Sequence, residues 1–222
     1  MHPVRKTVLA LAAAAALALG ACSTQPAAPA NPMTFFVTSA NPGKGAGFGG
    51  LAGADAHCEA LAAQAGAPGR NWRAYLSTTV GADAPAVNAR DRIGRGPWHN
   101  VTGELVASNV EELHGSNRLG KLTALTEKGE VISGRGDEVN MHDILTGSTP
   151  EGRAMTDGKD STCGNWTSSG DGSAIVGHHD RTGLDESAPA KSWNSSHATQ
   201  GCGMDQLKKT GGAGLLYCFA AK

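Results

Sequence analysis

The spacing of hydrophobic residues changes along the chain, and it predicts a helix early and strands late. A short apolar and β-branched run over residues 33–39 ends in a glycine-rich segment, which indicates a first strand. Apolar side chains then recur every three or four positions over 51–65, as on one face of a helix, and this places Cys58 on the buried face. Alternating apolar positions over 71–78 predict a second strand.

The rest of the chain has strand-like runs and no second long helical pattern. Residues 79–128 are loop-rich, with one short helix expected near 108–115. An early helix followed by a series of strands predicts a mixed α+β domain instead of a βαβ series. From residue 129 onwards, glycine, serine and aspartate separate the expected strands, which are 129–134, 142–148, 161–169, 173–181 and 214–221.

The N-terminus has the pattern of an export signal. Arg5 and Lys6 precede an alanine-rich apolar run over 8–19, and the small residues that follow lead to Cys22. This order is typical of a secretory signal peptide, and the small residues fit the lipobox of bacterial lipoproteins, where the cysteine is lipidated through its thiol. The alternative is an ordinary signal peptide that is cleaved elsewhere, with Cys22 incidental.

These signals divide the chain into three parts. We expect a lipoprotein signal peptide over 1–21, a lipidated cysteine with a flexible tether over 22–32, and one folded domain over 33–222. Ser23 stands where aspartate often marks inner-membrane retention, so the expected location is the outer membrane, on its surface or its periplasmic face. The chain is expected to be lipid-anchored, because its apolar runs are shorter than a membrane span requires.

Charge and cysteine content narrow the classes of function. Without Arg5 and Lys6, 17 basic residues stand against 20 acidic ones, whereas binding of nucleic acid or heparin usually requires a basic surface. Four cysteines remain after Cys22, and an even number in an exported chain indicates two disulfides, with three connectivities open. These cysteines are Cys58, Cys163, Cys202 and Cys218.

Several segments together resemble the endostatin domain of collagen and bacterial endostatin-like outer-membrane lipoproteins. The resemblance implies a C-type lectin-like fold, with two helices, small twisted antiparallel sheets and long loops. It also implies that the first cysteine pairs with the fourth and the second with the third, which gives Cys58–Cys218 and Cys163–Cys202. The segments are 53–66 (GADAHCEALAAQAG), 72–78 (WRAYLST), 87–93 (VNARDRI), 142–153 (HDILTGSTPEGR), 161–168 (STCGNWTS) and 214–219 (GLLYCF).

The same resemblance directs attention to the calcium and sugar corner of C-type lectins. Their Glu-Pro-Asn and Trp-Asn-Asp triplets correspond here to Thr-Pro-Glu at 149–151 and Trp-Asn-Ser at 193–195. Ca²⁺ needs six to eight oxygen ligands. Only Glu151 and Asn194 remain here as ligands, so the expected calcium site has lost part of its ligand set. In the alternative interpretation, Trp193 packs in the core and Asn194 caps a turn. The N-terminal zinc histidines and the arginine-rich heparin site of endostatin have no counterpart here.

A second metal signal is the sequence GHHDR at 177–181. His178 and Asp180 would lie on the same side of a strand, and an imidazole with a carboxylate suits zinc. His142 or His197 could approach as a third ligand. The alternative is a pair of surface histidines in a hairpin. Motifs for nucleophilic or phosphate chemistry are missing from the sequence, which favours a non-catalytic protein.

Two further features concern recognition of a partner. Residues 135–137 read Arg-Gly-Asp, the tripeptide that animal integrins bind, within a glycine-bounded turn. Trp98, in the sequence RGPWHN, is the tryptophan that we expect to be exposed, where it could stack on a sugar ring.

The sequence therefore predicts a lipid-anchored, lectin-like or adhesin-like binding module. Its expected partner is a glycan or an extracellular-matrix or host protein, and nucleic acid is not expected. The residues proposed for the ligand are Trp98, Glu151, Trp193 and Asn194. No cofactor is firmly implied, and calcium or zinc are the metals that the patterns allow. The alternatives are a metal-dependent hydrolase that uses His178 and Asp180, and a purely structural envelope lipoprotein.

Overall fold

Residues 1–2, 31–81 and 84–221 are described by the structure, a computed structural model of the chain. All but the first two residues of the expected signal peptide, the lipidation site at Cys22 and all but the last two residues of the tether lie outside these ranges. Asn31–Lys222 is a compact unit by its internal contacts. In the part of the chain that is described, no helix has both the length and the apolar character to cross a membrane.

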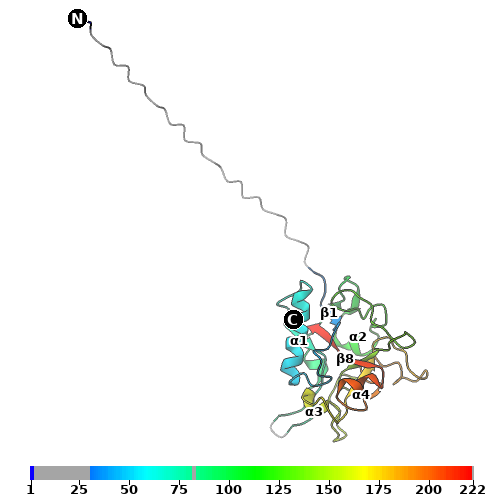
Figure 1. The fold of residues 1–222 in the computed structure, drawn as a ribbon. Helices are drawn as coiled ribbons and strands as arrows, with labels where there is room; N and C mark the ends of the chain where they lie inside the picture. The colour runs from blue at the N-terminus through cyan, green and yellow to red at the C-terminus, as the bar shows by residue number, and fades with distance from the viewer. Residues whose placement is uncertain (3–30, 82–83, 222) are drawn as a thin grey trace. The chain divides into compact units, whose positions relative to one another are not determined.

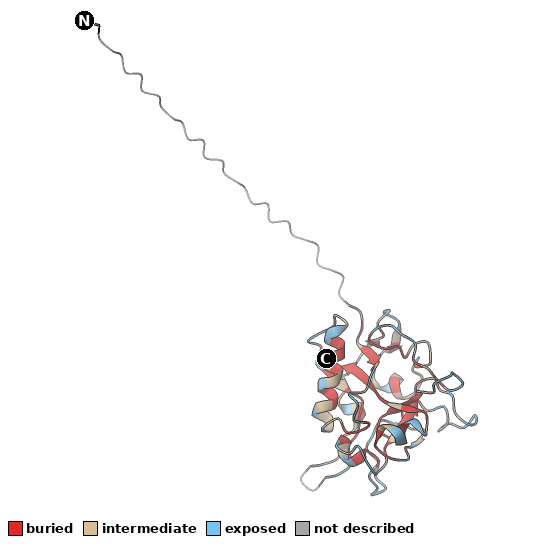
Figure 2. Ribbon diagram, in the orientation of Figure 1, coloured by how far each residue is buried: buried red, intermediate tan, exposed pale blue. Residues whose placement is uncertain are grey.

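The fold is organised around one long strand close to the C-terminus, β8 (Gly212–Ala220). Its side chains alternate between two hydrophobic clusters, so that Leu216 and Cys218 face one cluster while Tyr217 and Phe219 face the other. Because both faces are covered, nearly the whole strand is buried, as the red arrow at the centre of Figure 2 shows. This explains why its sequence is almost continuously apolar.

Short strands flank β8 on both sides (Figure 1). The sheet order is β1-β8-β5-β6-β7, and β2 also pairs with β8. Pairing is antiparallel except between β5 and β8, which run parallel, so the expectation of purely antiparallel sheets is wrong. The flanking strands are β1 (Phe35–Val37), β2 (Trp72–Ala74), β5 (Asp143–Leu145), β6 (Ile175–His178) and β7 (His197–Ala198).

The predicted amphipathic helix is confirmed as α1 (Gly50–Gln64). It packs against β2 and β8 through its buried face. Asp55 on this helix is 7% exposed, and its carboxylate forms ion pairs with Arg73 at 2.8 Å and with Arg92 at 2.7 Å. It also accepts a hydrogen bond from the backbone N–H of Ala74, which fixes the helix to the edge of the sheet.

The remaining elements are short. The expected short helix is present as α2 (Val110–His114), whereas the strand expected over 129–134 is not formed. The strand expected over 161–169 is also wrong, because α3 (Cys163–Trp166) has positive φ angles of 52°, 64°, 53° and 66° and forms a tight left-handed turn. Elements that the pattern did not predict are β7, a 3-10 turn (Ala89–Asp91), β3 (Trp98–His99), β4 (Leu105–Ala107) and α4 (Met204–Lys208).

Two disulfides join distant parts of this framework. Cys58 on α1 is bonded to Cys218 on β8, and Cys163 is bonded to Cys202. Both bonds confirm the pairing that the resemblance implied. A mixed α+β domain with few helices, small sheets, long loops and two disulfides is therefore established.

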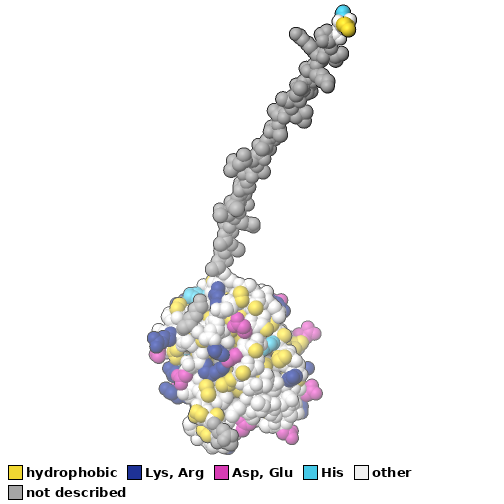
Figure 3. All heavy atoms as spheres, turned by 90° about the vertical axis from the view of Figure 1, so that its left-hand side faces the viewer, with side chains coloured by type: hydrophobic (Ala, Val, Ile, Leu, Met, Phe, Trp, Pro, Cys, Tyr) yellow, Lys and Arg dark blue, Asp and Glu magenta, His cyan; other side chains and the backbone are white. Residues whose placement is uncertain are grey.

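The face on which α1 lies carries charges of both signs (Figure 3). Basic and acidic side chains are interspersed there with apolar ones, and neither sign forms a continuous patch. This face offers no basic surface of the kind that a nucleic acid would need.

Candidate metal centre

The pairing of three strands brings polar side chains together at one end of the sheet. Asp143 at the start of β5 lies directly opposite His178 at the end of β6. His197 on β7 is opposite Val176, two positions before His178, and therefore belongs to the same face. His142 immediately precedes β5 and completes the group.

The three imidazoles converge on a single oxygen atom. The Nε2 atoms of His142, His178 and His197 lie 3.2, 3.3 and 3.4 Å from Oδ1 of Asp143. His142, Asp143 and His178 each offer a ligand atom within 4.8 Å of the others. Two ligands of a tetrahedral zinc ion, each about 2.0–2.1 Å from the metal, are roughly 3.3 Å apart. The spacing of the nitrogens from Oδ1 thus matches that of ligands around one metal ion.

The carboxylate oxygens of Asp143 and Nε2 of His178 are buried, and they have no hydrogen-bond partner among the described residues. Asp143 is 1% exposed and His178 is 3% exposed. A buried polar atom without a partner costs about 1–3 kcal/mol, and more if it is charged. A bound cation would remove this cost.

The charges of the cluster suit a cation. Burial acts to raise the pKa of Asp143, but the neighbouring imidazoles of His178 and His197 outweigh it and lower the pKa overall. Asp143 therefore remains an anion in its buried position. The same contact with Asp143 raises the pKa of His197 despite partial burial.

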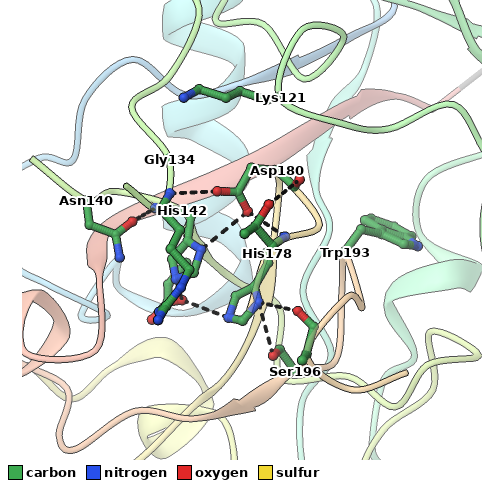
Figure 4. Close-up of polar contacts among 12 residues, drawn as sticks. Lys121, Gly134, Asn140, His142, His178, Asp180, Trp193 and Ser196 are labelled. Carbon is green, nitrogen blue, oxygen red and sulfur yellow. Dashed lines mark hydrogen bonds and ion pairs between the residues drawn. The ribbon is translucent and has the colours of Figure 1, made fainter. Parts of the chain in front are cut away.

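The far side of each of the three imidazoles faces a hydrogen-bond acceptor, and Figure 4 shows His142 with its partner Asp180. Nδ1 of His178 lies 2.7 Å from the carbonyl oxygen of Ala190, and Nδ1 of His197 lies 3.2 Å from that of Ala198. Nδ1 of His142 is 3.3 Å from Oδ1 of Asp180. Since these acceptors require a proton on Nδ1, each ring presents the lone pair of Nε2 to the centre, as a metal ligand must.

Asp180 follows the end of β6 and lies behind His142, with its Oδ1 3.3 Å from Nδ1 of that ring. Burial acts to raise its pKa, but hydrogen bonds from His142 and from the backbone N–H groups of Arg135 and Thr182 lower it well below the usual range. Asp180 is consequently an anion that orients His142.

The sequence pattern identified His178 and named His142 and His197 as third ligands, and the structure brings all three together. It did not identify Asp143, which supplies the central oxygen. Asp143 lies in a strand of apolar neighbours, where an acidic residue is unusual unless it is paired. An acidic residue in an apolar strand, directly after His142, was the feature of the sequence that could have identified Asp143 as part of the site.

A cavity of about 460 Å³ opens on this cluster. His142, His178 and His197 form part of its wall, and the side chain of His197 is 37% exposed at the opening. The cluster is therefore open to solution on the side of His197. The other residues of the wall are Arg135, Gly183, Leu184, Asp185, Ala190, Ser196, Lys209 and Thr210.

The corner that resembled the calcium site of lectins is arranged differently. Asn194 is 1% exposed, and its amide group contacts the hydroxyl of Tyr75 and the carbonyl oxygens of residues 149 and 150. Its Oδ1 is the acceptor for the hydroxyl of Ser192 at 3.2 Å. Glu151 is exposed. The amide of Asn194 thus fixes the 149–150 loop to the core.

The two tryptophans that were proposed to contact a ligand, Trp98 and Trp193, are both buried. Trp193 packs against the rings of Tyr75 and Tyr217 at centroid distances of 4.8 and 5.3 Å, as the alternative interpretation held. The expectation that Trp98 is exposed is wrong, because its side chain is fully buried against Phe219, with a centroid distance of 5.3 Å. Neither indole is available for stacking on a sugar in this structure.

The Arg-Gly-Asp tripeptide lies in the loop that borders the cavity. Asp137 forms an ion pair with Lys121 at 2.6 Å and accepts a hydrogen bond from the backbone N–H of Gly134. The carboxylate is therefore engaged within the protein. The backbone N–H of Arg135 donates a hydrogen bond to Asp180, and Arg135 also lines the cavity.

Comparison of the chain with models of protein families and with curated proteins finds no match to either. The chemical role of the site is therefore inferred from the residues of this chain alone.

Proposed function

We propose that the protein is a metal-dependent binding module that holds one zinc ion through His142, Asp143, His178 and His197. The observation that carries this proposal is the convergence of three Nε2 atoms on Oδ1 of Asp143 at 3.2–3.4 Å. Imidazole nitrogens with one carboxylate suit zinc and neighbouring transition metals, whereas calcium requires more oxygen ligands than this cluster offers.

Recognition of a ligand, in this proposal, takes place at the metal. The cavity beside the cluster is of the size of small-molecule sites. His197 stands at its opening, so a molecule in the cavity would reach the metal. The module would bind a glycan or a group on a matrix or host protein, which agrees with the function predicted from the sequence.

The cellular setting of the proposal comes from the sequence. The basic residues, apolar run and small residues before Cys22 support lipid attachment at the outer membrane. The segments that resemble endostatin, together with the mixed fold and the two disulfides, support a C-type lectin-like architecture.

A metal-dependent hydrolase is the second candidate. Its support is that three histidines facing an accessible cavity also occur in catalytic zinc sites, where the metal activates a bound water. Asp180, which the sequence suggested for such a site, is engaged with His142 and with two backbone N–H groups. The binding module is therefore the proposal that we prefer.

The test is the zinc content of the purified, untagged protein after equilibrium dialysis against zinc, measured by mass spectrometry of the metal. We expect one zinc per chain, and a loss of at least about tenfold in affinity for His197→Ala and for Asp143→Asn. His57→Ala is the control, because His57 lies on α1 outside the cluster. Equal zinc binding by the control and by the two cluster variants would refute the proposal.

A further inference from the structure

The cavity at the metal centre has a second wall that is chemically distinct from the histidines. Arg135 comes from the 133–137 loop and Lys209 from the end of α4. Both are exposed, and both line the same cavity as His142 and His178. Two segments that are far apart in the sequence thus place two cations in the wall of the cavity that the histidines line.

These two cations are not used by the protein itself. Among the described residues, neither the guanidinium of Arg135 nor the ammonium of Lys209 takes part in a hydrogen bond or an ion pair. Other cations nearby are engaged, since Lys121 pairs with Asp137 and Lys191 pairs with Glu186. Arg135 and Lys209 are thus two cations at the cavity that are available to a ligand.

Three aspartates lie near the cavity, and they outweigh the two cations unless a metal is bound. Asp185 is part of the wall, and its carboxylate accepts a hydrogen bond from the backbone N–H of Ser187. Asp180 lies behind His142 and is bound by backbone N–H groups. With a divalent metal at Asp143, the positive charges of the metal and the two cations exceed the negative charges of the three aspartates by one.

We infer that the cavity binds a small molecule that carries an oxyanion, a carboxylate, sulfate or phosphate group. One oxygen of this group would be a ligand of the metal, and the others would accept hydrogen bonds from Arg135 and Lys209. The exposed side chain of Leu184 gives the body of the molecule an apolar contact. The volume of about 460 Å³ suits a molecule of the size of an acidic sugar. This inference rests on the proposed metal site.

The experiment uses the purified protein loaded with cobalt(II), which occupies nitrogen and oxygen sites as zinc does and absorbs visible light. Galacturonate is titrated against galactose, its neutral counterpart, and the cobalt spectrum is recorded. We expect galacturonate to change the spectrum with saturation and galactose to leave it unchanged. Inorganic phosphate and sulfate are titrated in parallel, and the anion with the highest affinity identifies the class of oxyanion.

Variants of the wall test the role of the cations. We expect the Arg135→Ala/Lys209→Ala double variant to bind the anion at least about tenfold more weakly, while its cobalt spectrum without anion stays the same. Asp185→Asn should bind the anion more tightly, because a negative charge is removed. Lys208→Ala is the matched control, since Lys208 is exposed but does not line the cavity.

The outcomes separate this inference from the proposed function. Failure of cobalt to bind would refute the metal site itself. Cobalt binding with no spectral change from any of the anions would overturn the inference about the ligand and leave the metal site intact. An equal response to galactose and galacturonate, or equal anion affinity in the double variant, would overturn it as well.

Discussion

His142 and Asp180 form a carboxylate–histidine pair, with Nδ1 of the ring 3.3 Å from Oδ1 of the carboxylate. The opposite nitrogen of the same ring lies 3.2 Å from Asp143. Since Nδ1 then carries the proton, Nε2 is free to bind a metal. The stacking of His142 on His178, with a centroid distance of 4.0 Å and an interplanar angle of 10°, holds the ring in place.

We expect Asp180→Asn to weaken zinc binding by about 10- to 100-fold, the usual cost of removing an acceptor behind a zinc-bound histidine. The amide is of similar size but lacks the negative charge that favours a proton on Nδ1 of His142. The measurement is a competition titration with a chromophoric zinc chelator. Asp185→Asn removes a carboxylate from the cavity wall, away from the ligands, and serves as the control. An unchanged zinc affinity in Asp180→Asn would show that the pair does not orient the ligand.

Zinc should stabilise the folded protein. At a free zinc concentration of about 100 times Kd, the gain is about 2.7 kcal/mol. For a domain of this length, such a gain raises Tm by about 5–10 °C. Thermal unfolding is followed by circular dichroism under non-reducing conditions, with zinc, with calcium and with EDTA.

Calcium should leave Tm unchanged in that experiment, because the cluster offers mainly nitrogen ligands. His197→Ala should reduce the zinc-dependent rise by about half or more, as a loss of at least about tenfold in affinity requires. It should keep the Tm of the metal-free protein, since the side chain is 37% exposed. A rise of equal size with calcium, or an undiminished rise with zinc in His197→Ala, would count against the proposed ligand set.

Asp55 is the residue whose loss should most weaken the contact between α1 and β2. Asp55→Ala leaves the guanidinium of Arg92, whose side chain is 12% exposed, without its ion pair, and it also leaves Arg73 and the backbone N–H of Ala74 without their partner. We expect a loss of roughly 3 kcal/mol in the free energy of unfolding. Arg73→Ala should cost no more than about 1 kcal/mol, because that side chain is 39% exposed. Urea unfolding measures both, and equal losses would contradict the role given to Arg92.

His114 should make stability depend on pH. Partial burial lowers its pKa, and its Nε2 lies 2.8 Å from the hydroxyl of Tyr75. Burial also raises the pKa of Tyr75, so the hydroxyl keeps its proton and donates it to the neutral ring. Protonation of His114 breaks this hydrogen bond, and the stabilisation is therefore present above the unfolded pKa of about 6.5 and lost as the pH falls below it.

The check is urea unfolding at pH 7.5 and at pH 5. We expect the difference in free energy of unfolding between the wild type and His114→Gln to shrink on acidification. His99→Gln is the control, since the pKa of His114 is unaffected by it. A difference that stays constant or grows at pH 5 would contradict the assignment of a neutral His114.

The local spacing of apolar residues was sufficient to predict the long helix and the central strand. The three- and four-residue spacing around Cys58 gives α1, and the apolar run around Cys218 gives β8. The turn at Cys163 was predicted as a strand because its residues favour extended structure. Its left-handed backbone instead follows from longer-range bonds, in which Oδ1 of Asn165 accepts from the backbone N–H and the hydroxyl of Thr79.

The metal cluster could be predicted only in part. His178 stood out because it lies beside another histidine and an aspartate. The involvement of Asp143 depends on the register between β5 and β6, which pairs residues 35 positions apart, and local spacing does not fix such a register. The exposure of Trp98 was mispredicted for a similar reason, since Phe219 from the C-terminal strand covers it.

The most direct test of the metal site is an anomalous difference map at the zinc absorption edge, from crystals of the protein grown with equimolar zinc. We expect one strong peak about 2.0–2.2 Å from Nε2 of His142, His178 and His197 and from a carboxylate oxygen of Asp143. A map without a peak at these four residues, or with its strongest peak at another histidine, would contradict the account.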